Sequence, residues 1–187
     1  RTHESTIKPA LSPQERRSVG ALAAIYAARM LGLFLLLPVL ALYARDLSDY
    51  TPEMLGLAMG AYGLTQALLQ IPFGRWSDRF GRKPVIAIGL VLFAAGSLIG
   101  ALAQSVVMLT VARCVQGAGA VSAAVSALLA DLTRPEVRTR AMAVIGASIG
   151  LSFVLALVLA PVLDGAIGVP GIFVVMLVMA LGGIALL

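Results

Sequence analysis

The sequence predicts an all-α membrane protein that folds as a six-transmembrane-helix bundle. Of its 187 residues, 60% are hydrophobic and only 12% are charged, whereas soluble domains have about 25% charged residues. The apolar residues also gather into runs of about 20 residues, the length that an α-helix needs to cross a bilayer. A chain of this size cannot bury so much apolar surface in its own core, so lipid must be its main solvent.

Six apolar runs follow a polar tail at positions 1–18 and form a bundle at 19–187. The connections are short, so consecutive helices are expected to run antiparallel. The first run is too long for a signal peptide and five more follow it, so no cleaved leader is expected. The chain begins without Met and ends inside its sixth run, and we interpret it as a segment of a longer protein. The predicted spans are approximately 19–44, 54–74, 84–103, 106–130, 140–163 and 169–187.

The basic residues favour one orientation in the membrane. Of the 14 Lys and Arg residues, 11 lie in the tail and in the second and fourth connections, and Arg45 alone lies on the opposite side. Because short cytoplasmic loops are enriched in Lys and Arg, the tail and the chain end are placed in the cytoplasm (N-in/C-in). The same bias accounts for the net charge of +5, so no nucleic-acid partner is expected.

Polar residues inside the first two spans are candidates for a proton or solute pathway. Arg29 lies about ten residues into the first span, roughly 15 Å deep, and Tyr26 shares its helix face. A basic residue at that depth costs about 2.5–3.5 kcal/mol on insertion scales, so Arg29 should face the bundle interior. Tyr62, Gln66 and Gln70 form an i, i+4, i+8 stripe that should also point inward. The alternatives are an Arg29 that snorkels or anchors its helix, and a polar network that only stabilises the bundle.

The later spans add small residues and one more polar pair. Gly146 and Gly150 in the fifth span have the four-residue spacing that allows close helix packing, and packing without further function is the simpler interpretation. Arg113 and Gln116 form an i, i+3 pair in the fourth span. No Asp or Glu lies in the middle of any span. The two buried arginines therefore require an anionic solute, water, or an acid from a segment outside this chain.

The sequence gives little support for an enzyme. The only histidine, His3, lies alone in the tail, so neither a metal site nor a Ser–His–acid set can be assembled in the spans. Cys114 is the only cysteine, which excludes an intramolecular disulfide. Beside Arg113 it is more simply explained as a small buried hydrophobic residue than as an activated thiol. No cofactor and no metal are expected.

The stretch GRWSDRFGRKP, at positions 74–84, concentrates glycine, acid and base between the second and third spans. It resembles motif A of the major facilitator superfamily, which runs G-x-L-a-D-R-x-G-R-R/K in the loop between helices 2 and 3. Trp76 departs from the pattern, which usually has Leu at that place. The matching positions are Gly74, Asp78, Arg79, Gly81, Arg82 and Lys83.

Three further stretches resemble the same family. Motif B of helix 4, R-x-x-Q-G-x-G, is matched by Arg113, Gln116, Gly117 and Gly119. The family's loop between helices 4 and 5 is matched by Asp131, Pro135, Arg138 and Ala141. Motif C, the antiporter signature of helix 5, is only partly kept, because Pro161 is present but Ala160 replaces the glycine expected before it. Antiport is therefore less strongly indicated than transport.

The resemblance implies roles for the matched residues. Asp78 would lie at the cytoplasmic end of helix 2 and face the amino-terminal end of helix 11 in a carboxy-terminal half that this chain lacks. Arg82 would pair with Asp131 in a charge cluster that includes Arg138 and holds the outward-open state. Gly74 would permit close packing there, because any side chain would separate the helices. The motif B pair would lie near the cavity, where the family places proton-coupling groups.

The resemblance also implies a function for the whole protein. Within the superfamily the chain is most similar to the YajR-like bacterial members of the drug:proton antiporter group. It would be the amino-terminal half of a twelve-helix transporter in a bacterial inner membrane, exporting small drug-like molecules in exchange for protons by alternating access. Its partners would be the lipid bilayer, a small-molecule substrate, protons and the missing six-helix half. The alternatives are a uniporter or importer of the same superfamily and a membrane scaffold that transports nothing.

Overall fold

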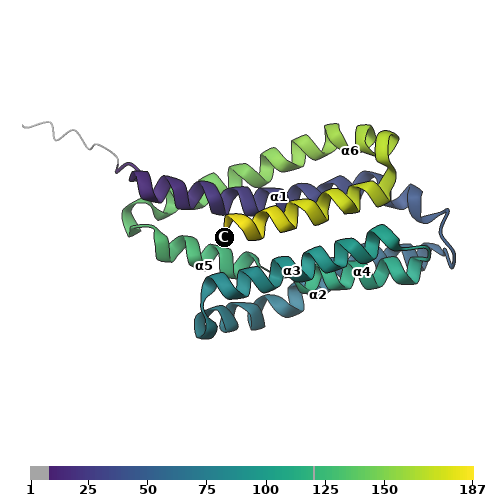
Figure 1. The fold of residues 1–187 in the computed structure, drawn as a ribbon, viewed down its shortest axis with the longest axis horizontal. Coiled ribbons are helices and arrows are strands. Elements are labelled where there is room, and N and C mark those ends of the chain that lie inside the picture. The colour runs from purple at the N-terminus through teal and green to yellow at the C-terminus, as the bar shows by residue number, and fades with distance from the viewer. Residues whose placement is uncertain (1–8, 120) are drawn as a thin grey trace, which may run out of the picture.

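The protein is entirely helical in the part that the computed structural model describes, residues 9–119 and 121–187 (Figure 1). Within that part no strand forms, and the only β-type pairing is an isolated bridge between Ser48 and Ser105. The first eight positions of the predicted tail lie outside the described residues. The helices are α1 (Pro13–Ala44), α2 (Pro52–Phe80), α3 (Arg82–Leu102), α4 (Val106–Ala118), α5 (Ser122–Leu132) and α6 (Pro135–Leu186).

Among the described residues, five helical stretches are long and apolar enough to cross a membrane: α1, α2, α3, the pair α4 and α5, and α6. The predicted class, an all-α membrane protein, is therefore confirmed. The number differs from the predicted six because α6 covers both the fifth and the sixth predicted spans. At 52 residues α6 would be about 78 Å long if straight. Its backbone leaves helical geometry at Gly168 (φ 69°, ψ 177°), and the last segment runs back beside α1 (Figure 1). The six-helix count and the N-in/C-in orientation stay predictions.

The helix ends follow from local sequence signals. Ser12 accepts a hydrogen bond from the backbone N–H of Glu15, whose carboxylate accepts one from the N–H of Ser12, forming a capping box before the apolar run. The first helix therefore begins at Pro13, six residues before the predicted start at position 19. Thr51 and Ser105 cap α2 and α4 in the same way, each accepting a backbone N–H three residues later.

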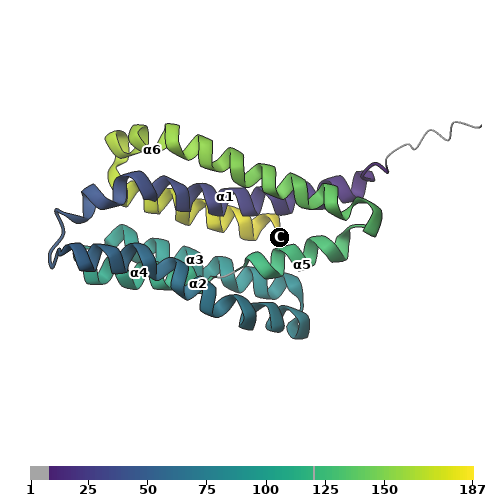
Figure 2. The ribbon, with the colours of Figure 1, turned by 180° about the vertical axis from the view of Figure 1, so that it is seen from behind.

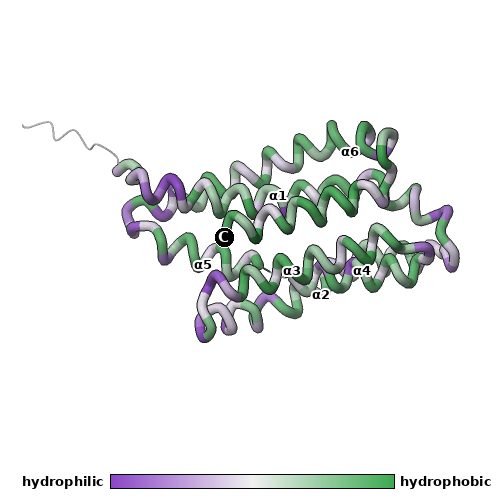
Figure 3. Tube along the Cα trace, in the orientation of Figure 1, coloured by the Kyte–Doolittle hydropathy of each residue, from purple (hydrophilic) through white to green (hydrophobic). Residues whose placement is uncertain are grey.

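The helices form two layers. Helix α1 packs mainly on α6 and α2 packs mainly on α4, while α3 contacts both α4 and α6. Figure 2 shows the same arrangement from behind, with α5 at one end of the bundle. Two buried apolar clusters hold the layers together, one around Leu36 and Phe173 and one around Ile25 and Leu129. Hydrophobic residues cover most of the helix length, and polar residues concentrate at the helix ends (Figure 3).

The small residues of the spans have different surroundings. A Cβ added at Gly117 would meet the backbone carbonyl of Tyr62, and one added at Gly119 would meet the carbonyl of Gly89. These two glycines therefore let α4 approach α2 and α3 closely. By contrast, a Cβ at Gly146 or Gly150 would meet no atom within 4 Å. Their predicted packing role finds no support among the described contacts and stays a prediction.

Candidate functional site

The turn between α2 and α3 places the motif A residues in one network. Gly81 adopts φ 99° between the two helices, a conformation that residues other than glycine rarely reach. The turn brings Arg82 back against the last turn of α2, where its Nη1 lies 2.5 Å from the Asp78 carboxylate and donates to Ser77 Oγ at 2.6 Å. Its Nε donates to Asp131 Oδ2 at 3.1 Å. The structure therefore contains the Arg82–Asp131 pair that the resemblance implies. We call Ser77, Asp78, Arg82 and Asp131 the motif A network.

Arg82 is the least exposed charged member of this network. Its side chain is 21% exposed, against 66% for Asp78 and 56% for Asp131. Exposed ion pairs contribute only about 0–1 kcal/mol each to stability. The main effect of Arg82 is therefore positional, since it joins the ends of α2, α3 and α5, and it leaves most of the Asp78 carboxylate open to a further contact.

The other motif A residues lie on the surface. Arg79 stacks on the ring of Phe80 at 5.3 Å, and Lys83 is exposed. A Cβ at Gly74 would meet the nearest atom, Ala123 Cβ, at 3.6 Å, which is an ordinary contact. No described neighbour within this chain therefore requires glycine at position 74, and its expected role in close packing at the gate stays a prediction.

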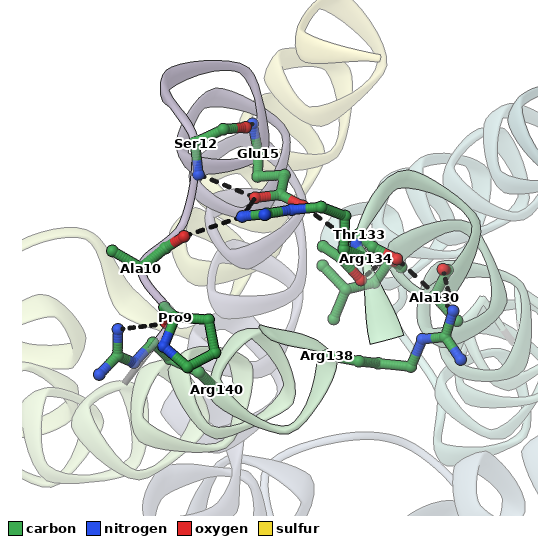
Figure 4. Close-up of polar contacts among 10 residues, drawn as sticks. Pro9, Ala10, Ser12, Glu15, Ala130, Thr133, Arg134, Arg138 and Arg140 are labelled. Atoms are coloured by element: carbon green, nitrogen blue, oxygen red, sulfur yellow. Dashed lines mark hydrogen bonds and ion pairs between the residues drawn. The ribbon is translucent and has the colours of Figure 1, made fainter. Parts of the chain in front are cut away.

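Arg138 does not join the motif A network. Its Nη2 donates to the carbonyl of Ala130 at 2.9 Å and weakly to that of Thr133 at 3.5 Å, near the C-terminal end of α5 (Figure 4). Backbone carbonyls at a helix C-terminus lack helical partners and attract cations. Arg138 thus caps α5 and makes no ion pair with Asp131 among the described residues, and its predicted part in the gate stays a prediction.

A second polar cluster ties the start of α1 to the turn between α5 and α6 (Figure 4). The Glu15 carboxylate accepts from Nε and the backbone N–H of Arg134, both at 3.0 Å, and from Nη2 of Arg134 at 3.1 Å. The Arg134 Nη2 also donates to the carbonyl of Ala10 at 2.9 Å. These bonds to Glu15 raise the pKa of Arg134 above its ordinary value. Sequence reasoning missed this pair, although Ser12 and Glu15 have the capping-box spacing that marks the start of a helix.

The bundle interior contains the second group of predicted residues. The guanidinium of Arg29 lies 5.7 Å from the ring centroid of Tyr62 and 5.5 Å from that of Phe93. Arg113 approaches the same Tyr62 ring at 4.9 Å. Both arginines are almost fully buried, with 3% and 2% of their surfaces exposed. Helices α1, α2, α3 and α4 each supply one of these four side chains.

A chain of hydrogen bonds extends from Arg113 into α3. Nη1 of Arg113 donates to Gln116 Oε1 at 3.1 Å, and Nε2 of Gln116 donates to Ser97 Oγ at 3.0 Å. The hydroxyl of Ser97 donates to the carbonyl of Phe93 at 2.7 Å. We call Arg29, Tyr62, Arg113, Gln116 and Ser97 the arginine cluster.

The structure brings together only part of the predicted pathway. Among the described residues, no hydrogen bond joins Tyr26, Gln66 or Gln70 to the arginine cluster, and the buried Oε1 of Gln70 has no partner. From the predicted stripe on α2, the ring of Tyr62 faces both arginines, and the roles of Tyr26, Gln66 and Gln70 stay predictions. Sequence reasoning missed Ser97. Its position as an isolated polar residue in the apolar run of the third span could have indicated it.

These features define a multi-pass α-helical membrane protein with charged networks at its helix ends and one polar cluster in its interior. The chain belongs to the Major Facilitator Superfamily, whose family model matches residues 22–187. This confirms the family resemblance. The superfamily consists of membrane transporters, so the expectation that the chain is not an enzyme is also confirmed.

Individual relatives agree with this assignment. The Inner membrane transport protein YajR of Escherichia coli is 48% identical over 176 residues, covering 94% of this chain and 39% of that protein. Multidrug resistance protein D of Escherichia coli is 37% identical over 83 residues, covering 44% of this chain and 21% of that protein. The crystal structure of the human organic anion transporter MFSD10 superposes with a TM-score of 0.75 at 23% identity, covering 94% of this chain and 47% of that one. The chain thus spans less than half the length of each.

Proposed function

We propose that the chain is the amino-terminal half of a secondary active transporter that exports small, drug-like molecules in exchange for protons. It would lie in a bacterial inner membrane with both ends cytoplasmic, and α6 would supply the fifth and sixth spans on either side of Gly168. The family assignment and the names of the transport and multidrug resistance relatives support this proposal. The observation that carries it is the motif A network, because its geometry suits a gate.

The gate would work through Asp78. Arg82 holds one side of this carboxylate, while two thirds of the side chain is exposed at the end of the bundle. A carboxylate in that position can bind the amino-terminal end of a helix in the missing half, an interaction of about 0.3–1 kcal/mol or more when partly buried. Since Arg82 also binds Asp131, a movement of that helix would act on the ends of α2, α3 and α5 together. Such a contact would stabilise the outward-open state and break when the cytoplasmic side opens.

The test is dye release from proteoliposomes that contain the full-length protein. Vesicles are loaded with ethidium, and the outside is acidified relative to the lumen. We expect release from right-side-out protein to accelerate with the gradient, and Asp78→Asn to abolish or strongly reduce it without loss of membrane insertion. Asp164→Asn is the matched control, because Asp164 is an exposed acid that makes no described ion pair. Wild-type release by Asp78→Asn would contradict the gating role.

The same assay separates the alternatives. Release that does not depend on the pH gradient would favour a uniporter, and uptake would favour an importer. The partial motif C, with Ala160 before Pro161, keeps both open. Correctly inserted protein that moves no solute would favour a scaffold.

A further inference from the structure

The arginine cluster contains two buried cations without an anionic partner. No nitrogen of Arg29 has a hydrogen-bond partner among the described residues, and the same holds for Nε of Arg113 and the hydroxyl of Tyr62. All of these atoms are buried. The aromatic rings of Tyr62 and Phe93 attract the charges, but they leave the N–H groups without acceptors. Buried polar groups in native proteins nearly always have hydrogen-bond partners, so these buried N–H groups require an acceptor that the described residues do not supply.

The missing partner is not a carboxylate of the described chain. Arg29 lies 16 residues after the start of α1 and 15 before its end, about 24 Å and 22 Å away along the helix axis. The three ion pairs of the described residues all lie at one end of the bundle and involve Arg82 and Arg134. The other acids of the described residues lie in the connection between α1 and α2, in the first turn of α2 or α6, or beside the reversal of α6.

We propose that the arginine cluster binds a single small anionic group, either the carboxylate of the transported solute or a free halide. Arg29 supplies the unpaired donors, and Arg113 Nε and the Tyr62 hydroxyl add two more around the ring that both arginines face. Gln116 and Ser97 hold Arg113 in place through their hydrogen bonds. Water would satisfy the donors but would leave two positive charges uncompensated in a low-dielectric interior, where an unpaired charge is costly.

This inference rests on the proposed transport function and deepens it, since it assigns a negative charge to the solute. Arg29 and Arg113 lie on helices that belong to different layers, so one anion would bridge α1 to the pair of α2 and α4. The test measures anion binding and not transport. A negative result for this inference can therefore be told apart from a negative result for the proposed transport function.

The experiment is calorimetric titration of the purified full-length protein in a chloride-free HEPES buffer. The probes are sodium acetate, sodium benzoate and sodium chloride, with benzamide as the neutral counterpart of benzoate. We expect a carboxylate to bind and benzamide not to bind. Arg29→Gln should weaken binding about ten- to a hundredfold, the range expected for the loss of a charge-assisted hydrogen bond. Arg45→Gln, which removes an exposed arginine at the C-terminal end of α1, should leave the binding affinity unchanged.

A second variant covers the case in which Arg29→Gln does not fold. Tyr62→Phe keeps the ring that faces both arginines and removes only the free hydroxyl, so we expect it to fold and to weaken binding several-fold. Binding of chloride with the same dependence on Arg29 or Tyr62 would support the site and identify a free anion as its ligand. The inference is overturned if none of the three anions binds, or if binding is unchanged in the variants. Release of carboxyfluorescein, a dye with carboxylates, is measured beside that of ethidium, and anion binding without release of either dye would contradict the proposed function alone.

Discussion

The same substitution, glycine to alanine, should have opposite effects on stability at two places in the bundle. At Gly117 in α4, an added Cβ would lie against the backbone carbonyl oxygen of Tyr62, 3.1 Å from its carbonyl carbon and 3.0 Å from the Cβ of Thr65. Backbone atoms cannot rotate away as a flexible side chain can, so α4 must move from α2. Overpacking of this kind costs about 1–3 kcal/mol. At Gly182 in α6, an added Cβ meets no atom within 4 Å, and glycine in a helix costs roughly 0.5–1 kcal/mol relative to alanine.

The assay is thermal unfolding of the full-length protein and its variants in one detergent. Gly117→Ala should lower the free energy of unfolding by about 1–3 kcal/mol, and Gly182→Ala should raise it by up to about 1 kcal/mol. A change of 1 kcal/mol shifts Tm by roughly 2–4 °C in a domain of 150–250 residues, so the two variants should differ by several degrees. The reasoning is refuted if Gly117→Ala is as stable as the wild type, because α4 would then not approach α2 as closely as the structure describes.

Three further outcomes follow from the helix ends. Arg82→Lys keeps the charge but cannot bridge two carboxylates with a fork of donors, so dye release should fall well below the wild-type rate while insertion is unchanged; full activity would show that a point charge suffices. Glu15→Ala removes the oxygens that accept from the backbone and guanidinium of Arg134, so hydrogen exchange at the Arg134 amide should accelerate, and an unchanged rate would contradict this contact. Gly81→Ala places a side chain at φ 99°, a conformation that costs about 1–3 kcal/mol, and should lower Tm, whereas an unchanged Tm would argue against that turn geometry.

Sequence reasoning succeeded where one local signal decides the outcome. Apolar runs of membrane-spanning length predicted the helical stretches, because lipid forces every backbone polar group into an internal hydrogen bond. The α6 reversal at Gly168 lies between the fifth and sixth predicted runs, so the pattern anticipated a break that the helix bounds alone do not show. The Arg82–Asp131 pair, 49 residues apart, came only from the family resemblance, since no local pattern links these positions.

Contacts that depend on the packing of distant helices could not be predicted. Glu15 and Arg134 are 119 residues apart. The sequence around an acid and a base in polar segments is the same whether or not the two residues form an ion pair, so it does not predict their contact. Gln66 and Gln70 share the α2 stripe with Tyr62, but the ring of Tyr62 is the one that faces the guanidinium groups of Arg29 and Arg113, and this arrangement depends on where α1 and α4 lie against α2. Periodicity defines a helix face, but tertiary packing decides which part of that face is buried.

The turn between α5 and α6 connects the two charged networks at this end of the molecule. Asp131, in the last turn of α5, binds Arg82 of the α2–α3 turn. Three residues later, Arg134 binds Glu15 at the start of α1. Arg138 fixes the turn between them through the carbonyls at the end of α5. Each exposed pair is weak alone, but together they tie the ends of α1, α2, α3, α5 and α6 to a single short segment. In the gate proposed above, a force on Asp78 would therefore act on the whole end of the bundle.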